Sequence, residues 1–344
     1  MKYLPLFFIS FFVAFFGVWF IRRLAFQKNW HITPSSDRWH KTPTVLFGGV
    51  GFAPVIIIFQ IYIIVSHSIS IPLLGIILIV GTLSMFFLGL IDDIWPIGPI
   101  KKLLTQVVVA GLFIHSGGVF NLSSYDLLDI FISYLWFIVI INSLNMLDNM
   151  DGLAAGIACL SIIFLIIISI PSSGSDPLII PFGIIILATL IAFLLFNYNP
   201  ASIFMGDSGS LSLGFALAAL TIPSELNFNF GLSINSKINT YIFFLIPLAL
   251  LSVQIFDFVF VTINRLIKGK KPYIGGRDHT SHTLVKLGMS DKKAVFFLYV
   301  LCILGGSVAV GIKFYKFDAI IFFVSYFFVL MVLAIYLSLK ANTK

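Results

Sequence analysis

The sequence predicts an all-α polytopic membrane protein with about eleven transmembrane helices, in a single domain that spans residues 1–344. Composition is the first reason, because 59% of the residues are hydrophobic and only 10% are charged. The mean hydropathy of +1.08 supports the same conclusion, since soluble domains do not have such compositions. The second reason is that apolar runs of about 20 residues recur along the chain, and each can cross a ~30 Å hydrocarbon core as a helix.

Eleven apolar runs are expected to be transmembrane helices. The first has one lysine before it, Arg22 and Arg23 at its end and no small-residue cleavage site. It is therefore interpreted as a membrane anchor rather than a signal peptide. The runs at 101–116 and 209–223 are the shortest. In chain order the runs are 3–24, 48–66, 71–91, 101–116, 128–147, 152–171, 178–197, 209–223, 241–265, 293–313 and 317–339.

The basic residues predict the orientation of the chain. With the N-terminus outside and the C-terminus in the cytoplasm, all 21 Lys and Arg residues except Lys2, Lys237, Lys313 and Lys316 fall on the cytoplasmic side. The positive-inside rule requires this asymmetry. Topology and attraction to anionic lipid headgroups explain the net charge of +7, so the expected partner is the lipid bilayer and not nucleic acid.

Polar side chains concentrate in the connections predicted to face the cytoplasm. The outside connections are short or rich in Ser, Asn, Gly and Pro, and Asp257 is the one acid well within a predicted helix. Acids and amides beside a bilayer are costly unless they bind a cation or a polar ligand. The active site is therefore expected on the cytoplasmic face. Cys159 and Cys302 fall within predicted helices and are interpreted as small buried side chains.

Asp92 and Asp93 end the third apolar run and precede Lys101 and Lys102. Adjacent carboxylates raise each other's pKa unless a cation or a donor is near. The pair is interpreted as functional, and the alternative is a solvated turn at the membrane interface.

Amides and acids recur every third residue in the next cytoplasmic cluster, which places them on one slowly turning helix face. Capping of the helix that follows Gly152 would use one or two of them, whereas the cluster contains four. They are Asn142, Asn145, Asp148 and Asp151.

A third cluster, Phe204-Met-Gly-Asp-Ser-Gly-Ser210, precedes the eighth run. Small residues at a helix start let a phosphate approach free N–H groups. Asp207 could hold a divalent cation that phosphate oxygens complete. The alternative is an Asp or Ser N-cap with glycines for the turn.

Two further connections are basic. The connection after Arg265 carries Arg277, His279 and His282, which suit phosphate contacts, and it has no zinc-binding motif. The first connection is the least informative, and its glycines are interpreted as easing close helix packing or a turn. Its polar and small residues are His31, Arg38, His40, Lys41, Pro43, Gly48 and Gly49.

In this order the motifs resemble those of the polyprenyl-phosphate N-acetylhexosamine-1-phosphate transferases, which belong to glycosyltransferase family 4. These membrane enzymes move a sugar phosphate from a UDP-sugar to a polyprenyl phosphate. The resemblance covers nearly the whole chain, and the expected helix count looks like that of the bacterial undecaprenyl-phosphate GlcNAc-1-phosphate transferase branch. The matching motifs are Lys41-Thr-Pro43-Thr…Gly48-Gly49, Asp92-Asp93, Asn142…Asp151-Gly152, Met205-Gly206-Asp207-Ser-Gly-Ser and Arg277-Asp-His279…His282.

The resemblance implies a role for each site residue. Asp92 would act on the carrier phosphate with support from Asp93, and Asp151 would lie at the uracil. The metal ligands would be Asp207 and Asn145, with Mg²⁺ as the cofactor and Mn²⁺ as the alternative. The implied catalytic set is Asp92, Asp93, Asp148, Asp151, Asp207, His279 and His282. The implied substrate-binding set is Lys102, Asn142, Asn145, Asp148, Asp151, Arg277, His279 and His282.

This chain departs from the family pattern at three places. Many relatives have a further acid where this chain has Pro96. Their His-x-His-His run appears here as His279-Thr-Ser-His282, and a following Arg is Thr283. The consecutive-His element of the phospho-muramoyl-pentapeptide transferase is also missing. These departures concern sugar specificity more than the reaction.

The expected function is transfer of N-acetylhexosamine-1-phosphate from UDP-GlcNAc or a related UDP-acetamido sugar to undecaprenyl phosphate, with release of UMP. The reaction would initiate a cell-envelope polysaccharide such as a lipopolysaccharide O-antigen, in the bacterial inner membrane. Direct attack and a covalent aspartyl-phosphate route both remain open, as does a homodimer. One alternative is a phospho-MurNAc-pentapeptide transferase. Another, of a different class, is a secondary transporter for an anionic solute, for which Asp257 is the supporting residue.

Overall fold

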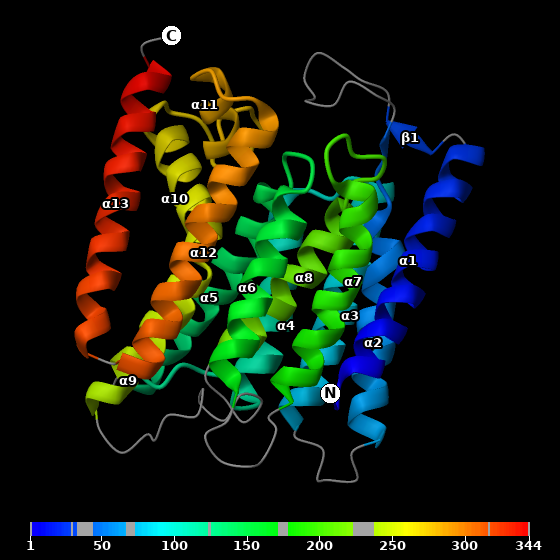
Figure 1. Cartoon of the computed structure of the whole chain (residues 1–344), viewed down its shortest axis with the longest axis horizontal. Coiled ribbons are helices and arrows are strands. Elements are labelled where there is room, and N and C mark those ends of the chain that lie inside the picture. The colour runs from blue at the N-terminus through cyan, green and yellow to red at the C-terminus, as the bar shows by residue number, and fades with distance from the viewer. Residues whose placement is uncertain are drawn as a thin grey trace.

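The computed structural model describes residues 2–28, 30–32, 44–66, 73–122, 125–170, 178–222, 237–315 and 317–342. Its helices form one bundle, in which the start of α1 and the end of α13 lie at opposite ends (Figure 1). The described helices are α1 (Leu4–Gln27), α2 (Gly48–Ser66), α3 (Leu73–Ile94), α4 (Pro99–His115), α5 (Asp126–Leu147), α6 (Leu153–Ser169), α7 (Ile179–Asn197), α8 (Gly206–Thr221), α9 (Lys237–Leu250), α10 (Ser252–Ile267), α11 (Thr280–Lys286), α12 (Asp291–Tyr315) and α13 (Phe317–Asn342).

Every apolar run predicted to span the membrane contains a helix or a helix pair. Within the described part of the chain, seven helices are long and apolar enough to cross a bilayer, or up to eight if α9 and α10 form one broken span. Helix α6 is a shorter apolar helix of 17 residues, and α4 and α8 have 17 and 16 residues; such lengths correspond to about 25 Å of helix. The protein is therefore a multi-pass membrane protein, and the count of eleven and the orientation stay predictions.

The run at 241–265 differs from the continuous helix that the sequence predicts. The structure breaks it at Leu251, and the axis bends by 76° between Phe244–Leu250 and Ser252–Ile267. Pro247 lies within α9 and lacks the N–H that an uninterrupted helix would use, and sharp bends are usually found near proline. Two short elements were also not predicted, namely α11 and a hairpin of β1 (His31–Ile32) with β2 (Thr44–Val45).

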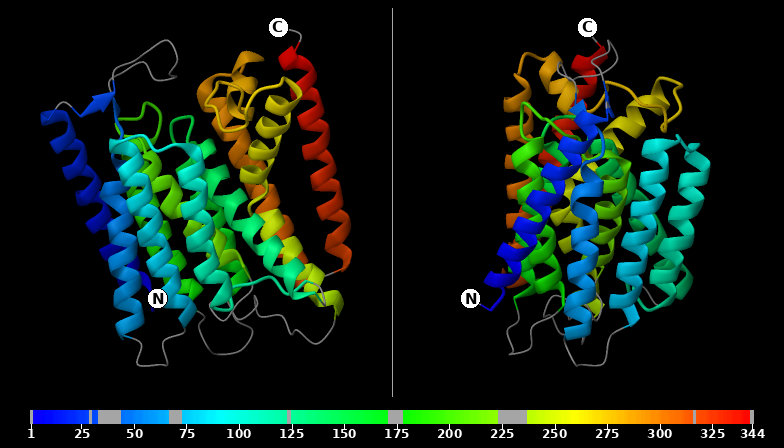
Figure 2. Two further views of the ribbon diagram at one scale, coloured as in Figure 1. Left: turned by 180° about the vertical axis from the view of Figure 1, so that it is seen from behind. Right: turned by 90° about the vertical axis from the view of Figure 1, so that its right-hand side faces the viewer.

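Helix α8 lies at the centre of the bundle, against α2, α3 and α5 (Figures 1 and 2). All of its residues except Asp207 are buried. Its small residues let neighbouring helices approach closely. The Cα of Ile141 on α5, for example, lies 2.8 Å from where a side chain on Gly214 would begin. Asp207, in the first turn of α8, is therefore held in place by helices that pack on several sides of α8.

The starts of α2 and α8 are joined through their backbones. Gly48 N–H donates to Phe204 O and Gly49 N–H donates to Met205 O, both at 2.8 Å, and Val45 forms a parallel bridge with Ile203. A side chain on Gly49 would collide with the backbone of Gly209. The prediction that these glycines serve close helix packing is confirmed.

Gly89 on α3 provides a test of this packing. A Cβ at Gly89 would collide with the backbone of Asp207 and Ser208, whereas one at Gly98 would meet nothing within 4 Å. We expect Gly89→Ala to destabilise the protein by about 1–3 kcal/mol because it overpacks the α3–α8 contact. Gly98→Ala is the matched control and should be nearly neutral. Thermal unfolding of both variants in detergent would measure the difference, and equal melting temperatures would contradict the close approach.

Candidate active site

Asp93 at the end of α3 caps the start of α8 from another helix. Its carboxylate accepts hydrogen bonds from the backbone N–H groups of Asp207 and Ser208, at 2.8 and 3.0 Å. Gly206 adopts a φ of +71°, and a Cβ there would lie 2.8 Å from an Asp93 oxygen. Glycine is therefore needed at the turn that delivers Asp207 to the site.

Lys102 joins the two acids that the resemblance assigns to the carrier and to the metal. From the first turn of α4, its ammonium contacts Asp92 at 3.0 Å and Asp207 at 2.9 Å. Asp92 also accepts the Ile97 N–H at 2.6 Å. Lys101 is exposed, and the part of the chain that the structure describes records no salt bridge for it. Of the two neighbouring lysines, Lys102, which the resemblance implies as a substrate-binding residue, is therefore the one that contacts both acids.

The amides of α5 have separate positions. Asn145 donates from Nδ2 to Asp207 Oδ1 and to Ser210 Oγ, both at 2.9 Å. Asn142, about one turn earlier, exchanges hydrogen bonds with Gln106 of α4 at 2.7 and 3.3 Å. Asn145 thus contacts the acid cluster directly, whereas Asn142 joins α4 to α5 beside it.

Asp148 follows the last residue of α5 and is close to the other acids. Burial, followed by the negative charges of Asp207 and Asp93, raises the pKa of Asp148 to about 7. A carboxyl group in this range is partly protonated at neutral pH. The negative charges of Asp93, Asp148 and Asp207 are therefore not fully compensated by the neighbouring hydrogen-bond donors. Strongly raised carboxyl pKa values of this kind are frequent at functional sites.

Asp151 links the α5–α6 connection to the α7–α8 connection. It accepts hydrogen bonds from Asn199 Nδ2 at 3.0 Å and from Ala201 N–H at 2.9 Å. Nearby, Asn197 accepts the Gly152 N–H at 3.1 Å and donates to Ile203 O at 2.9 Å. These bonds fix the two connections relative to each other.

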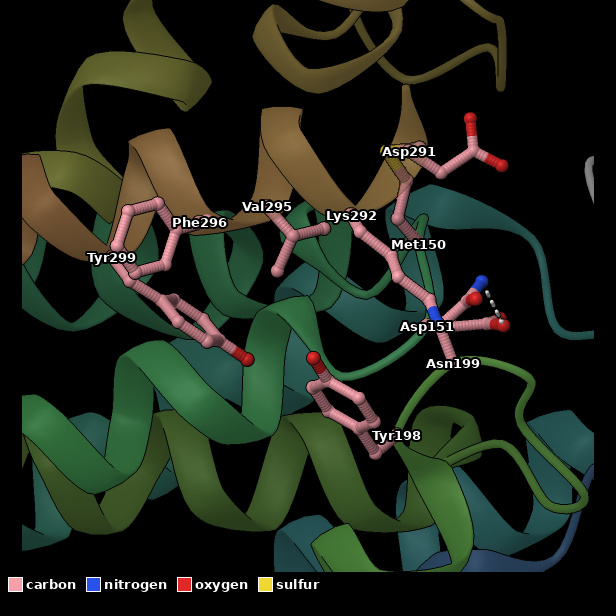
Figure 3. A pocket seen from close by; sticks show the side chains of 9 residues that line it. All are labelled: Met150, Asp151, Tyr198, Asn199, Asp291, Lys292, Val295, Phe296 and Tyr299. Atoms are coloured by element: carbon pink, nitrogen blue, oxygen red, sulfur yellow. Dashed lines mark hydrogen bonds between the residues drawn. The ribbon is translucent and has the colours of Figure 1, made fainter. Parts of the chain in front are cut away.

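Asp151 and Asn199 also line a small pocket between these connections and the start of α12 (Figure 3). Its volume of about 50 Å³ fits only a group the size of a water molecule or two. Two larger cavities are apolar. One, of about 510 Å³, lies among α1, α2 and α3 and has Asp93 in its wall. The other, of about 520 Å³, lies between α10 and α13.

The connection between α10 and α11 folds back onto the bundle through an ion pair. Arg265 makes two bonds of 2.7 Å to Asp278 and a third, of 2.6 Å, to Pro272 O. Burial alone would raise the pKa of Asp278, but the hydrogen bonds and charge of Arg265 outweigh it and hold the pKa below its usual value. Asp278 is therefore ionised at neutral pH and anchors the residue next to it, Arg277.

The two histidines lie beside each other at the end of this connection, with ring centroids 5.9 Å apart. His279 contacts Asp257 of α10 through Nδ1 at 2.8 Å. Burial, followed by the electrostatic effect of the neighbouring His279, lowers the pKa of His282 to about 4, so His282 is neutral at physiological pH. Ser281, between them, donates to Asn149 Oδ1 at 2.7 Å and thus joins α11 to the α5–α6 connection.

The acids of the site are of the kind that could hold a divalent cation together with a phosphate. Among the described residues, no group of three or more His, Cys, Asp or Glu side chains could hold a metal by itself. Mg²⁺ is usually held by one or two carboxylates, with water and substrate phosphate completing its shell. Asp207 and Asp148 have carboxyl oxygens of this kind. Asn145 presents its Nδ2 to Asp207, so metal ligation would require its Oδ1 to turn inward.

Several contributors escaped the sequence analysis. Gln106, Asn197 and Asn199 are single amides without a motif of their own, and nothing in the sequence identifies Asp278 as the partner of Arg265. Asp257 carried a signal, because it is the one acid well within a predicted helix, away from its ends, but its partner could not be identified from sequence. The predicted cluster at Arg38, His40, Lys41 and Pro43 lies outside the described residues.

Comparison with known proteins decides the family. The model of glycosyl transferase family 4 matches residues 75–225. A phospho-N-acetylmuramoyl-pentapeptide-transferase of Staphylococcus saprophyticus is 30% identical over 61% of this chain and 72% of its own length. This chain belongs to glycosyl transferase family 4. The family match contains every acid of the cluster around Lys102, whereas Arg277 and the two histidines lie beyond it.

Two other relatives of this family-4 chain act on polyprenyl phosphates, according to their names. A probable undecaprenyl-phosphate N-acetylglucosaminyl 1-phosphate transferase of Bacillus subtilis is 29% identical over 68% of this chain and 64% of that protein. A decaprenyl-phosphate N-acetylglucosaminephosphotransferase of Mycolicibacterium smegmatis is 25% identical over 84% of this chain and 76% of that protein. The chain thus spans less than two thirds of the Bacillus relative.

The raised pKa of Asp148 predicts a pH dependence of stability for the cation-free family-4 protein. The pKa of Asp148 is about 7 in the folded protein and about 3.9 in the unfolded chain. Between these two pH values the folded state therefore binds more protons than the unfolded state. Stability should therefore be highest at low pH within this window and fall as the pH rises towards about 7.

The measurement is the melting temperature in detergent with a chelator, at about pH 5 and about pH 8. Asp148→Asn keeps a neutral side chain at both values, so its decrease should be smaller than that of the wild type by at least about 2 °C. An equal decrease in both proteins would contradict the assignment.

Proposed function

We propose that this protein transfers N-acetylhexosamine-1-phosphate from a UDP-sugar, UDP-GlcNAc or a related UDP-acetamido sugar, to undecaprenyl or another polyprenyl phosphate, and releases UMP. The observation that carries the proposal is the bridge of Lys102 between Asp92 and Asp207. It lies where apolar helices end, so a membrane-embedded carrier and a water-soluble nucleotide can both reach it. The names of the Bacillus and Mycolicibacterium relatives support the same reaction.

The chemistry requires cations because both reactants are anionic. A carrier phosphate and a diphosphate repel each other, and charge on the transferring phosphoryl group must be stabilised. Lys102 provides one positive charge between the acids, and Arg277 and His279 are proposed to hold the diphosphate with His282. A bound Mg²⁺, or Mn²⁺ in its place, would supply Lewis-acid stabilisation of the phosphate oxygens through Asp207.

In the proposed step, an oxygen of the carrier phosphate attacks the β-phosphorus of the UDP-sugar. A new P–O bond forms, the bond between the β-phosphorus and the bridging oxygen breaks, and its electron pair leaves with UMP. A phosphate monoester has a second pKa near 6, so much of the carrier is already dianionic at neutral pH. Asp92 has both oxygens engaged, by Ile97 and Lys102, so its proposed role is to position Lys102 and the carrier rather than to remove a proton.

The polyprenyl tail needs an apolar surface beside the acids. The cavity of about 510 Å³ among α1, α2 and α3 has Asp93 in its wall and is otherwise lined by apolar side chains such as Ile21, Phe47 and Leu90. Hydrocarbon and carboxylate therefore lie next to each other here. This juxtaposition supports a lipid-linked acceptor over a wholly water-soluble one.

The phospho-MurNAc-pentapeptide transferase is the second candidate, because the Staphylococcus relatives bear that name at 30 and 33% identity. A transporter is less well supported. Asp257, its main supporting residue, is bonded to His279 and to the backbone of Thr280, and so contributes to the connection that carries the histidines. We place the enzyme in the bacterial inner membrane, at the start of a cell-envelope polysaccharide such as an O-antigen, with a homodimer as an open question.

The decisive assay measures UMP release from purified protein with undecaprenyl phosphate, Mg²⁺ and a panel of donors. The panel contains several UDP-N-acetylhexosamines and UDP-MurNAc-pentapeptide. Asp207→Asn should lower the rate by about 10²–10³-fold, because it removes charge from the proposed cation site. The matched control is Asp126→Asn, because Asp126 is an exposed acid at the start of α5, whereas Asn145 of the site lies near its end. Carrier-independent release, or none with any donor in folded protein, would refute the proposal.

The neighbouring lysines provide a second test. Lys102→Gln removes the charge between Asp92 and Asp207 and should lower turnover by about 10²–10³-fold, while Lys101→Gln should retain nearly full activity. Lys102→Gln also leaves Asp92 and Asp207 without their counter-charge, so its melting temperature should fall, whereas Lys101→Gln should melt like the wild type; turnover is therefore compared per folded protein. Equal turnover of the two variants would show that the bridge does not contribute to catalysis.

A further inference from the structure

A buried carboxylate on α10 is not used by the proposed chemistry. Asp257 has an exposed fraction of 0%, and its two oxygens accept hydrogen bonds from different donors. Oδ2 lies 2.8 Å from His279 Nδ1, and Oδ1 accepts the backbone N–H of Thr280 at 2.8 Å. A buried charge is costly unless it is paired and hydrogen-bonded, and both conditions are met only through the segment that carries the histidines.

The contact decides which nitrogen of His279 carries a proton. An ionised carboxylate is only an acceptor, so Nδ1 must be the donor. Nε2 is then left as the nitrogen that can meet a ligand, either as an acceptor or, in the imidazolium, as a donor. A carboxylate behind a histidine is a general way to set its tautomer and ring orientation.

The same contact sets where His279 lies relative to the acid cluster. The Thr280 bond fixes the backbone next to the ring, and the Ser281 bond to Asn149 joins the following residue to the α5–α6 connection. On the other side, Arg265 holds Asp278. His279 is therefore restrained from three directions, by α10, by the α5–α6 connection and by the loop before it.

We propose that Asp257 is a positioning residue that keeps Nδ1 of His279 protonated and thereby presents Nε2 to the phosphates of the sugar nucleotide. The inference rests on the proposed function for the identity of the ligand. It differs from a purely structural reading, in which Asp257 only caps the first turn of α11 and the state of the His279 ring is irrelevant.

One substitution separates the two readings. In Asp257→Asn, the amide oxygen can still accept the Thr280 N–H, so the structural contact is kept. The amide nitrogen would face His279 and donate to Nδ1, which forces the proton onto Nε2. This kind of exchange impairs histidine-dependent enzymes by imposing the wrong tautomer.

The first measurement needs no activity. In ¹⁵N-histidine-labelled protein, with His279→Gln used to assign the signal, the imidazole shifts of His279 should report a protonated Nδ1 in the wild type and a deprotonated Nδ1 in Asp257→Asn. A neutral His279 with its proton on Nε2 in the wild type would overturn the inference. Because the wild type alone can give this result, the test holds even if the variant does not fold.

The second measurement is a double-mutant cycle on UMP release. We expect Asp257→Asn to lower kcat about 10- to 100-fold and to have no further effect in the His279→Gln background, because it acts through that ring. Asp129→Asn is the control, since Asp129 is another buried acid of the bundle and accepts a backbone N–H from Leu122 at 3.1 Å. It should leave kcat unchanged.

Additive losses in the cycle would assign Asp257 a structural role and overturn the inference. If the wild type releases no UMP with any donor, the proposed function fails, and the tautomer measurement still decides the state of His279. A protonated Nδ1 would then support the positioning of the ring without the assigned ligand.

Discussion

The site depends on the capping of α8 by Asp93. Helix α8 is almost wholly buried, so its first N–H groups have no water to bond, and an unpaired N–H in such a place is costly. Asp93, at the end of α3, supplies both acceptors, and this contact fixes the position of Asp207 in the first turn of α8. The bridge through Lys102 and the bond from Asn145 then form around a position that is already set.

Hydrogen bonds join the connections around this contact to one another. Asp151 and Asn197 hold the α5–α6 and α7–α8 connections together, the backbones near Gly48 and Met205 join the first connection to them, and Ser281 adds α11. Loops that carry function are usually mobile unless a scaffold holds them. Here each connection is hydrogen-bonded to another, and these bonds hold the acids at fixed positions relative to one another.

Much of this arrangement could be predicted from the sequence. Apolar runs located the helices, because lipid imposes a length and a composition that can be read directly. The acid motifs were expected on one face because each lies at the end or the start of an apolar run, and the structure brings Asp92, Asp207 and Lys102 into contact. The partner of Asp257, the tie between Asp151 and Ala201, and the bend at Leu251 could not be predicted, because each depends on how distant segments meet or on a local break. The raised pKa of Asp148 likewise could not be predicted, because it depends on burial and on how close Asp93 and Asp207 lie in the folded protein.

The salt bridges of Lys102 have a consequence for how the site is loaded. Without ligands, one ammonium already balances part of the charge on two carboxylates. Under the proposed function, an incoming phosphate that recruited Lys102 would uncover Asp207, and a divalent cation bound at Asp207 would free the lysine for a phosphate. Anion and cation would then enter by ionic exchange, in which each makes room for the other.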